Sequence, residues 1–230
     1  MSNNDNQLEF STVLAAAVHD MKNSLCLLLQ SIENLNACLP STNDESSVHL
    51  ASAHYEASRL NTGLVQLLSL YRAGLKNLPI NIDQHYLDDV IDEVLATNAS
   101  YLKHKNISLK VELVDNLSWY LDLDLICILL NDMLINAMRY CQGNILLTVG
   151  TQDDQLLISV HDDGPGYPVA MLEANKSELL DFDISHGRTG LGLFFARLIA
   201  KAHSKDEKYG LISLQNGGKL GGSVFTLMLP

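Results

Sequence analysis

Two long apolar seams constrain the fold of this chain more than any other feature of its sequence. In both seams, apolar residues recur at alternating spacings of four and three, which is the heptad pattern of one helix face. The first seam is Leu14, Val18, Met21, Leu25, Leu28, Ile32 and Leu35, and the second is Leu50, Ala53, Ala57, Leu60, Leu64, Leu67 and Tyr71. Pro40 and the polar residues after it interrupt the helical pattern, so a turn is predicted between the seams.

The two seams predict an antiparallel helical hairpin that dimerises. Each helix would have about 30 residues and a length of about 45 Å, and a short loop leaves the two helices side by side. One such hairpin cannot cover both of its apolar stripes. Two copies can bury the stripes in a four-helix bundle, so we expect a homodimer that forms through the N-terminal hairpin.

After residue 76 the heptads give way to alternating helices and strands, which predicts a domain boundary. Residues 10–76 would form the helical hairpin and residues 77–230 a second domain. Strands are expected at 79–82, 107–113, 144–149, 155–161, 211–215 and 223–229, an extended segment at 119–121, and helices at 83–102, 123–140 and 191–203. Strands gathered around few helices, with the last two adjacent in sequence, predict an α/β sandwich with a mixed sheet. The whole chain is therefore expected to be of the α+β class.

Charge and cysteine usage narrow the classes of function. The chain has 27 acidic and 15 basic residues, for a formal net charge of −12, which argues against nucleic acid and anionic membrane surfaces as partners. Its four cysteines lie in apolar helical contexts without CxxC spacing, so neither a zinc site nor a disulfide framework is predicted. A reducing cytoplasm is therefore the expected location. No stretch approaches about 18 uncharged apolar residues, so no membrane span is expected.

A D-x-G-x-G pattern follows the predicted strand at 155–161. It consists of Asp162, Gly164 and Gly166. A carboxylate at a strand end can accept a hydrogen bond from an exocyclic amine, and glycines let the backbone approach a flat ring or a phosphate. An ordinary turn of the Asp-Gly-Pro-Gly type is the alternative interpretation.

A second glycine-rich segment, from Gly187 to Gly192, opens the predicted helix at 191–203. Bare backbone N–H groups and the positive end of the helix dipole make such a helix start a phosphate cradle. The segment has no GK[ST] of a Walker loop, and no strand runs directly into it as a dinucleotide-binding motif requires. A loop that only reverses the chain is the alternative.

The predicted helix at 123–140 carries a polar stripe on an otherwise apolar sequence. Asp132, Asn136 and Arg139 recur at i, i+4 and i+7, which places them on one face. Asn and Asp are poor helix formers, so their place in mid-helix calls for a reason. Oxygen ligands for Mg²⁺ and a cation for a triphosphate would supply one, and a solvated face is the alternative.

The order of these three segments resembles the N, G1 and G2 boxes of the ATPase superfamily shared by gyrase, MutL, heat-shock chaperones and histidine kinases. The ending GSVFTLMLP is most similar to histidine kinases. The resemblance implies ATP and Mg²⁺ as cofactors, with Asn136 as the magnesium ligand, Asp132 as a second candidate ligand, and Asp162 on the adenine amino group. The other nucleotide-binding residues that it implies are Arg139, Tyr140, Gly164, Gly166, Thr189, Gly190, Leu191 and Gly192.

The resemblance extends upstream to residues 18–23, which look like the histidine box of the two-component sensor histidine kinases. It implies that His19 attacks the γ-phosphate of ATP while Asp20 orients or accepts the proton of the other ring nitrogen. The phosphoryl group would pass to an aspartate of a response-regulator receiver domain, and Asn23 implies a phosphatase activity toward that regulator. A separate sensor protein is a further candidate partner. Without the resemblance, His19 reads as a partly buried helix histidine, and Ser24 stands where the family usually has Pro.

Two other functions compete with the kinase. An ATP hydrolase of the gyrase or chaperone type is the first, because Asp132 precedes Asn136 by four residues, where those enzymes keep a water-activating carboxylate. The histidine box and the helical hairpin favour the kinase over it. The second is a non-catalytic dimeric phosphotransfer or scaffold protein, and the presence of Asp162, Asn136 and the glycines speaks against it.

Overall fold

The computed structural model describes residues 21, 23–32, 35, 50, 53, 56–57, 60, 63–64, 78, 80–176 and 191–230. The chain divides into two compact units, Met1–Asn77 and Leu78–Pro230. All described residues of the first unit are helical. The turn predicted between the two helices falls within residues 36–49, which lie outside the description. The antiparallel hairpin and the four-helix bundle therefore stay predictions.

Burial in the first unit differs along the predicted seams. Ile32 and Ala57, one from each seam, are 7% and 4% exposed. Four other seam residues are between 48% and 57% exposed in the single chain, namely Met21, Leu28, Leu35 and Leu60. Large apolar side chains in solvent have a free-energy cost that a second helical surface would remove.

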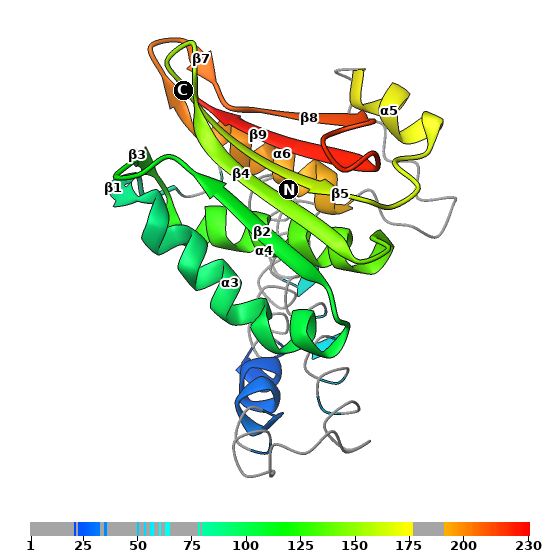
Figure 1. Cartoon of the computed structure of the whole chain (residues 1–230). Coiled ribbons are helices and arrows are strands. Elements are labelled where there is room, and N and C mark those ends of the chain that lie inside the picture. Colours follow the sequence, from blue (N-terminus) through cyan, green and yellow to red (C-terminus); the bar gives the residue numbers. More distant parts are fainter. Residues whose placement is uncertain are drawn as a thin grey trace, which may run out of the picture. The chain divides into compact units, whose positions relative to one another are not determined.

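A five-stranded mixed sheet forms the centre of the second unit (Figure 1). Its strand order is β2-β4-β5-β9-β8. The strands are β2 (Ser108–Leu113), β4 (Asn144–Gln152), β5 (Gln155–Asp162), β8 (Leu211–Asn216) and β9 (Ser223–Leu229). β2 runs parallel to β4, and the other neighbours are antiparallel. The expected mixed sheet is confirmed.

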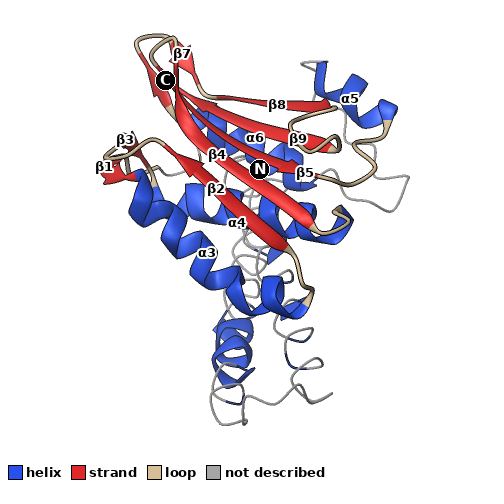
Figure 2. Cartoon of the chain, in the orientation of Figure 1, coloured by secondary structure: helices blue, strands red, loops and turns tan. Residues whose placement is uncertain are grey.

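Three helices pack on one face of this sheet, as Figure 2 shows. They are α3 (Leu87–His104), α4 (Leu123–Tyr140) and α6 (Leu191–Ala202). On β5 the alternate residues Leu156, Ile158 and Val160 are buried, and in the register with β9 they lie opposite Leu229, Leu227 and Phe225. Because side chains alternate between the faces of a strand, the next residue of this apolar row is Asp162. A carboxylate thus ends a row that is otherwise core.

Short elements around the sheet correct the expected boundaries. β1 (Asp83–Tyr86) pairs antiparallel with β3 (Ser118–Leu121), so the strand expected at 79–82 lies further along the chain. The helix expected to begin at residue 83 therefore begins later. Asp83 belongs to the strand β1, and α3 begins at Leu87, after Tyr86 in an extended conformation. α5 (Val169–Lys176) and the hairpin of β6 (Ser204–Lys205) with β7 (Lys208–Tyr209) were not predicted. All depend on pairing or packing with residues distant in sequence, or on segments too short for a clear period.

Asp122 joins α4 to two other elements. Its carboxylate caps the helix by accepting from the Leu125 backbone N–H (3.0 Å), and it also accepts from the Asn81 backbone N–H (2.7 Å). The Asp122 backbone N–H donates to Nε2 of His203 (3.0 Å), just after α6. The proton of His203 therefore lies on Nδ1, which is 2.8 Å from the Ile199 carbonyl oxygen. These bonds fix the start of α4 relative to the end of α6.

Acidification is expected to destabilise the second unit because of its buried histidines. Burial lowers the pKa of His203 below the usual 6.5, against the hydrogen bond to Ile199 and the charge of Asp122. Burial likewise lowers the pKa of His161, whose Nδ1 is buried without a hydrogen-bond partner among the described residues. A lowered pKa means that the unfolded state binds more protons, so stability is full above the unfolded pKa and falls as the pH drops below it.

The measurement is urea unfolding at pH 8 and pH 5.5, followed by the fluorescence of Trp119, the single tryptophan of the chain, which lies in β3. The free energy of unfolding should fall with acidification in the parent chain and fall less in His203→Gln. Equal pH dependence in both proteins would contradict the role of His203.

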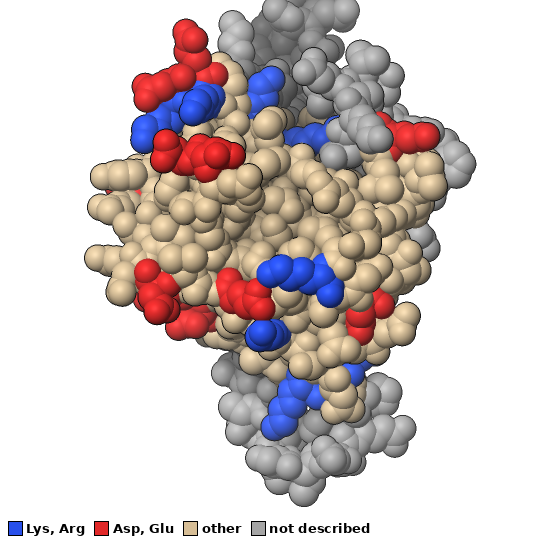
Figure 3. All heavy atoms as spheres, turned by 45° about the horizontal axis from the view of Figure 1, so that its top comes forward, with Lys and Arg blue, Asp and Glu red and all other residues tan. Residues whose placement is uncertain are grey.

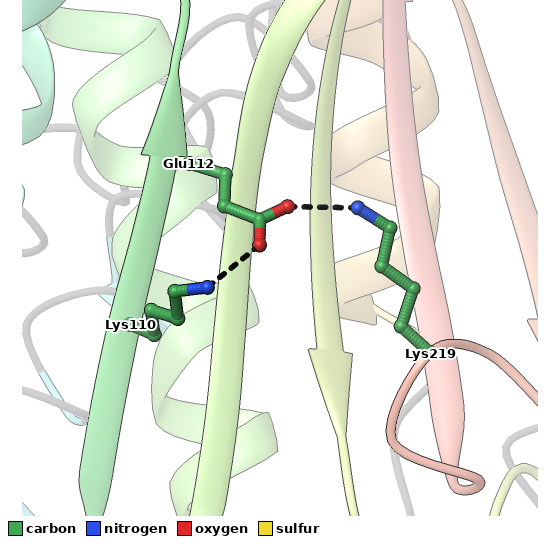
Figure 4. Close-up of polar contacts among 3 residues, drawn as sticks. All are labelled: Lys110, Glu112 and Lys219. Atoms are coloured by element: carbon green, nitrogen blue, oxygen red, sulfur yellow. Dashed lines mark hydrogen bonds and ion pairs between the residues drawn. The ribbon is translucent and has the colours of Figure 1, made fainter.

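Glu112 lies between two lysines on the sheet face away from the helices (Figure 4). Its carboxylate oxygens are 2.9 Å from Lys110 Nζ and 2.8 Å from Lys219 Nζ. Hydrogen bonds from Lys219 and Lys110 lower the pKa of Glu112 to about 2. Exposed pairs of this kind contribute little to stability, but Lys219 connects the β8–β9 loop to β2. Figure 3 shows acidic and basic side chains interspersed around a largely uncharged area.

Candidate nucleotide-binding site

A buried carboxylate at the end of β5 is the centre of the candidate site. Asp162 is only 4% exposed. Its Oδ1 accepts from the backbone N–H groups of Gly164 (2.7 Å) and Ser223 (3.1 Å), and its Oδ2 accepts from the Ser223 hydroxyl in a short contact. A carboxylate offers about four acceptor positions. Three internal donors therefore orient the group and leave acceptor capacity for a ligand N–H.

Two glycines make room for this carboxylate. A Cβ on Gly164 would collide with the Tyr140 carbonyl oxygen and lie 2.9 Å from Asp162 Oδ1. A Cβ on Gly222 would lie 2.5 Å from the Gly164 nitrogen and 2.6 Å from the Asp162 carbonyl oxygen. Both positions are closer than side-chain carbon atoms tolerate. The close approach of three backbone segments around Asp162 therefore depends on glycine.

Gly166 and the residue after it contact the end of β8. Gly166 has a φ of +82°, and a Cβ there would lie 2.8 Å from the Asn216 side chain. The Asn216 amide accepts from the Tyr167 backbone N–H (2.7 Å) and donates to the Tyr167 carbonyl oxygen (2.9 Å). The D-x-G-x-G segment is therefore held in a defined conformation rather than being an ordinary surface turn.

Asp163 anchors the same segment to the start of β4. Its carboxylate accepts from the backbone N–H groups of Gln142 (2.7 Å), Gly143 (3.2 Å) and Asn144 (3.0 Å), and from the Asn144 side chain (2.8 Å). Burial alone would raise the pKa of Asp163, but the hydrogen bonds of Asn144, Gln142 and Gly143 outweigh it and lower that pKa. The end of β5 is thus tied to the turn that follows α4.

The polar stripe of α4 leads toward this segment. Asp132 and Asn136 are half-buried, whereas Arg139 and Tyr140 are exposed. Gly164 packs on the carbonyl of Tyr140, and Asn136 lies one turn earlier on α4. The structure therefore brings Asp162 and Gly164 to the C-terminal end of the helix that carries the candidate magnesium ligands.

The remaining expected site residues belong to α6 or to the first unit, or lie outside the description. Leu191 and Gly192 are the first two residues of α6. Asn23 is an exposed residue of the helical stretch in the first unit. His19, Asp20, Thr189 and Gly190 lie outside the described residues.

Four residues of the observed network were not predicted from the sequence, namely Tyr167, Asn216, Gly222 and Ser223. Tyr167 follows the D-x-G-x-G segment, Asn216 ends β8, and Gly222 and Ser223 stand immediately before and at the start of β9. The Gly-Gly-Ser run before the last strand was the available signal, since it ends in a hydroxyl group next to residues that permit close approach. The strand pairing that brings it to Asp162 is not visible in the sequence.

The described residues contain neither a cluster of metal-ligating side chains nor a membrane-spanning helix. Within residues 21–176 and 191–230, as far as they are described, no cluster of three or more His, Cys, Asp or Glu could hold a metal ion. In that same part of the chain, no helix has the length and apolar character needed to cross a membrane.

Comparison with known proteins agrees with the geometry. Residues 121–230 match the family of histidine kinase-, DNA gyrase B- and HSP90-like ATPases. The sensor protein PhoQ of Escherichia coli K12 is 22% identical over 196 residues, a match that covers 85% of this chain and 39% of PhoQ. Residues 121–230 thus resemble the ATPase domains of that family, and the chain is similar to sensor histidine kinases. It spans about two fifths of the length of the curated relatives that it matches.

Solved structures show the same fold. Full-length ShkA in complex with AMPPNP has a TM-score of 0.63 and 18% identity, with 95% of this chain and 45% of ShkA covered. Histidine kinase ThkA in complex with the response regulator TrrA has a TM-score of 0.58 and 19% identity, with 99% of this chain and 64% of that chain covered. At these identities the likeness concerns the fold.

Proposed function

We propose that the chain is an ATP-dependent protein-histidine kinase that phosphorylates its own His19. The observation that carries the proposal is the Asp162 carboxylate, buried, oriented by three donors and surrounded by glycines at the end of α4. An acceptor held in this way suits the exocyclic amine of adenine. The family match over residues 121–230 and the AMPPNP complex of ShkA support a nucleotide as the ligand.

In this proposal α4 and the start of α6 hold the triphosphate. Asn136 supplies an amide oxygen to Mg²⁺, with Asp132 as a second ligand, and Arg139 and Tyr140 lie near the phosphates. Mg²⁺ commonly takes one or two protein oxygens together with substrate phosphates rather than a full protein cage, which suits these residue types. When bound, the ion would neutralise charge on the transferred group. Gly190 and Gly192 would offer backbone N–H groups at the start of α6.

The phosphoryl group then moves between units. A ring nitrogen of neutral His19 attacks the γ-phosphorus, the bond to the bridging oxygen of ADP breaks, and Asp20 accepts or orients the proton on the other ring nitrogen. Phosphohistidine next passes the group to an aspartate of a response-regulator receiver domain. The ThkA–TrrA complex supports a partner of this class. Because the related PhoQ is named a sensor protein, a separate sensor protein is a further proposed partner.

We also propose that the chain is a homodimer. The exposed seam residues Met21, Leu28, Leu35 and Leu60 support a second hairpin packed against the first. Apolar residues at heptad spacing bury together when two hairpins form a four-helix bundle. Sedimentation equilibrium of the purified chain tests this state, and a monomer at micromolar concentration would contradict it.

Incubation of the purified chain with γ-labelled ATP and Mg²⁺ tests the kinase proposal. Label should appear on the protein and be lost in acid while resisting alkali, as expected of a phosphoramidate on histidine. A gyrase-type hydrolase, which the Asp132–Asn136 spacing keeps as the second candidate, would release free phosphate without labelling the chain. Neither label nor phosphate release would favour the non-catalytic scaffold.

Asn23→Ala is expected to remove a phosphatase activity and spare the kinase. Asn23 is an exposed helical residue four positions after His19 in the sequence, and its amide could position a water against a phosphorylated regulator. We expect dephosphorylation of the cognate phospho-regulator to slow by about 100-fold or more, because a side chain that positions the reacting proton typically contributes at least that much. The label on His19 should form at the parental rate. Unchanged dephosphorylation would refute the assignment.

A further inference from the structure

Three successive backbone N–H groups of the turn after α4 converge on one side chain, the carboxylate of Asp163. The donors are Gln142 (2.7 Å), Gly143 (3.2 Å) and Asn144 (3.0 Å), and the Asn144 side-chain amide adds a bond of 2.8 Å. Successive N–H groups that point at one spot form a small anion-binding concavity. The protein fills this concavity with a carboxylate of its own, and both carboxylate oxygens take part.

The two segments that Asp163 joins carry different halves of the proposed nucleotide site. Asp162 and Gly164 are its neighbours in the chain, on the side proposed for the base. On the other side is the C-terminal end of α4, where Arg139 and Tyr140 come just before the turn. The backbone of Gly164 lies so close to the Tyr140 carbonyl that a Cβ would not fit between them. A shift of either segment would therefore change the distance between the two halves.

Asp162 is supported separately from this anchor. Its carboxylate accepts from the Gly164 N–H and from the N–H and hydroxyl of Ser223, and its carbonyl oxygen accepts from the Gly222 N–H (3.1 Å). None of these four donors belongs to α4 or to the turn after it. Loss of the Asp163 bonds should therefore leave Asp162 oriented while it releases the turn that follows α4.

We propose that Asp163 is a positioning residue that fixes the phosphate-binding end of α4 relative to the base-binding segment. Four charge-assisted hydrogen bonds on one carboxylate define both position and orientation. A ligand that bridges two half-sites gains from both only when their separation matches its own length. Asp163 would therefore act on the joint binding of base and triphosphate, without contact to either. This inference rests on the proposed nucleotide site.

Asp163→Asn tests the anchor with the size of the side chain retained, because its amide nitrogen would set donors against the N–H groups of the turn. Two dissociation constants are measured with the full chain, that of adenosine by ligand-observed NMR titration and that of Mg-ATP by titration calorimetry. Adenosine occupies only the base half and should bind as in the parent. Mg-ATP should bind about tenfold more weakly, because linked half-sites lose their joint gain when their geometry no longer matches. The ratio of the two constants is the readout.

Two further variants sharpen the test. Asn144→Ala removes only the side-chain bond to Asp163 and keeps the three backbone donors, so the ratio should shift in the same direction by a smaller factor. It decides the question if thermal unfolding, followed by the fluorescence of Trp119, shows that Asp163→Asn does not fold. Asp153→Asn removes the same charge from an exposed residue between β4 and β5, and it should leave both dissociation constants at the parental values.

The outcomes separate this inference from the proposed function. Weaker binding of Mg-ATP with unchanged binding of adenosine supports the positioning role. If the variants bind both ligands as the parent does, or weaken both by one factor, the positioning role is overturned and the nucleotide site stands. A parent chain that binds Mg-ATP but no adenosine overturns it as well, because the base half would not bind by itself. If the parent chain binds neither ligand, the proposed function falls and this inference falls with it.

Discussion

Replacing His19 by glutamine is expected to remove all acid-labile phosphoryl label from the chain while ATP binding is retained. Glutamine is polar and of similar size, but it has no ring nitrogen to attack phosphorus. The residues proposed to bind ATP all belong to the unit Leu78–Pro230, whereas His19 belongs to Met1–Asn77. Loss of the acceptor should therefore leave the dissociation constant of Mg-ATP unchanged in titration calorimetry.

His54→Gln is the matched control for this substitution. His54 is another histidine within the predicted hairpin, and its replacement should leave the label at the parental level. Full labelling of His19→Gln would transfer the role of acceptor to a different residue. Loss of both label and ATP binding in His19→Gln would instead show that the substitution disturbed the protein as a whole.

Asp162→Asn has the second large expected effect, and it acts on the nucleotide. Asparagine has nearly the same volume, so the packing of Gly164 and Gly222 around the side chain can persist. Its amide nitrogen presents donors where the carboxylate only accepts. Loss of a hydrogen bond to a charged group costs about 2–3 kcal/mol, which corresponds to a roughly 30- to 150-fold weaker binding of ATP. Label on His19 should fall in parallel at limiting ATP.

Asp154→Asn is a suitable control for the change of charge. Asp154 lies in the turn between β4 and β5 with a φ of +58°, a conformation that asparagine also accepts. Its replacement should leave the affinity for ATP unchanged. Parental affinity in Asp162→Asn would contradict the role of Asp162 in reading the base, whatever the phosphorylation assay shows.

Elements with strong local signals were predicted well from the sequence. The helix expected at 123–140 has those bounds, because Asp122 supplies an N-cap and the apolar period is long. The last two strands and the end of β5 were also located, since each is an apolar alternating run bounded by polar or glycine residues. Asp162, Gly164 and Gly166 were assigned to the site from residue type and spacing. The Asp162 carboxylate is buried and Gly164 packs against it.

Elements that depend on pairing with residues distant in sequence were not predicted correctly. β1 forms at Asp83–Tyr86 because Ser118–Leu121 pairs with it, and nothing local separates it from the expected strand at 79–82. Ser223 and Asn216 look like ordinary residues of a hairpin until β9 is paired with β5 on one side and β8 on the other. Their roles appear only with that strand order.

By itself, the sequence determined which residue types this protein brings to its chemistry: a carboxylate after an apolar strand, glycines beside it, and a polar stripe on an apolar helix. These follow from local physics, namely side-chain period and backbone freedom. Only the tertiary structure decided that Ser223 donates to Asp162 and that Gly222 packs against it. The same holds for the hydrogen bond between Tyr167 and Asn216. Hydrogen bonds between residues about 50 to 60 positions apart exist only after strands are paired, and no spacing along the chain encodes that register.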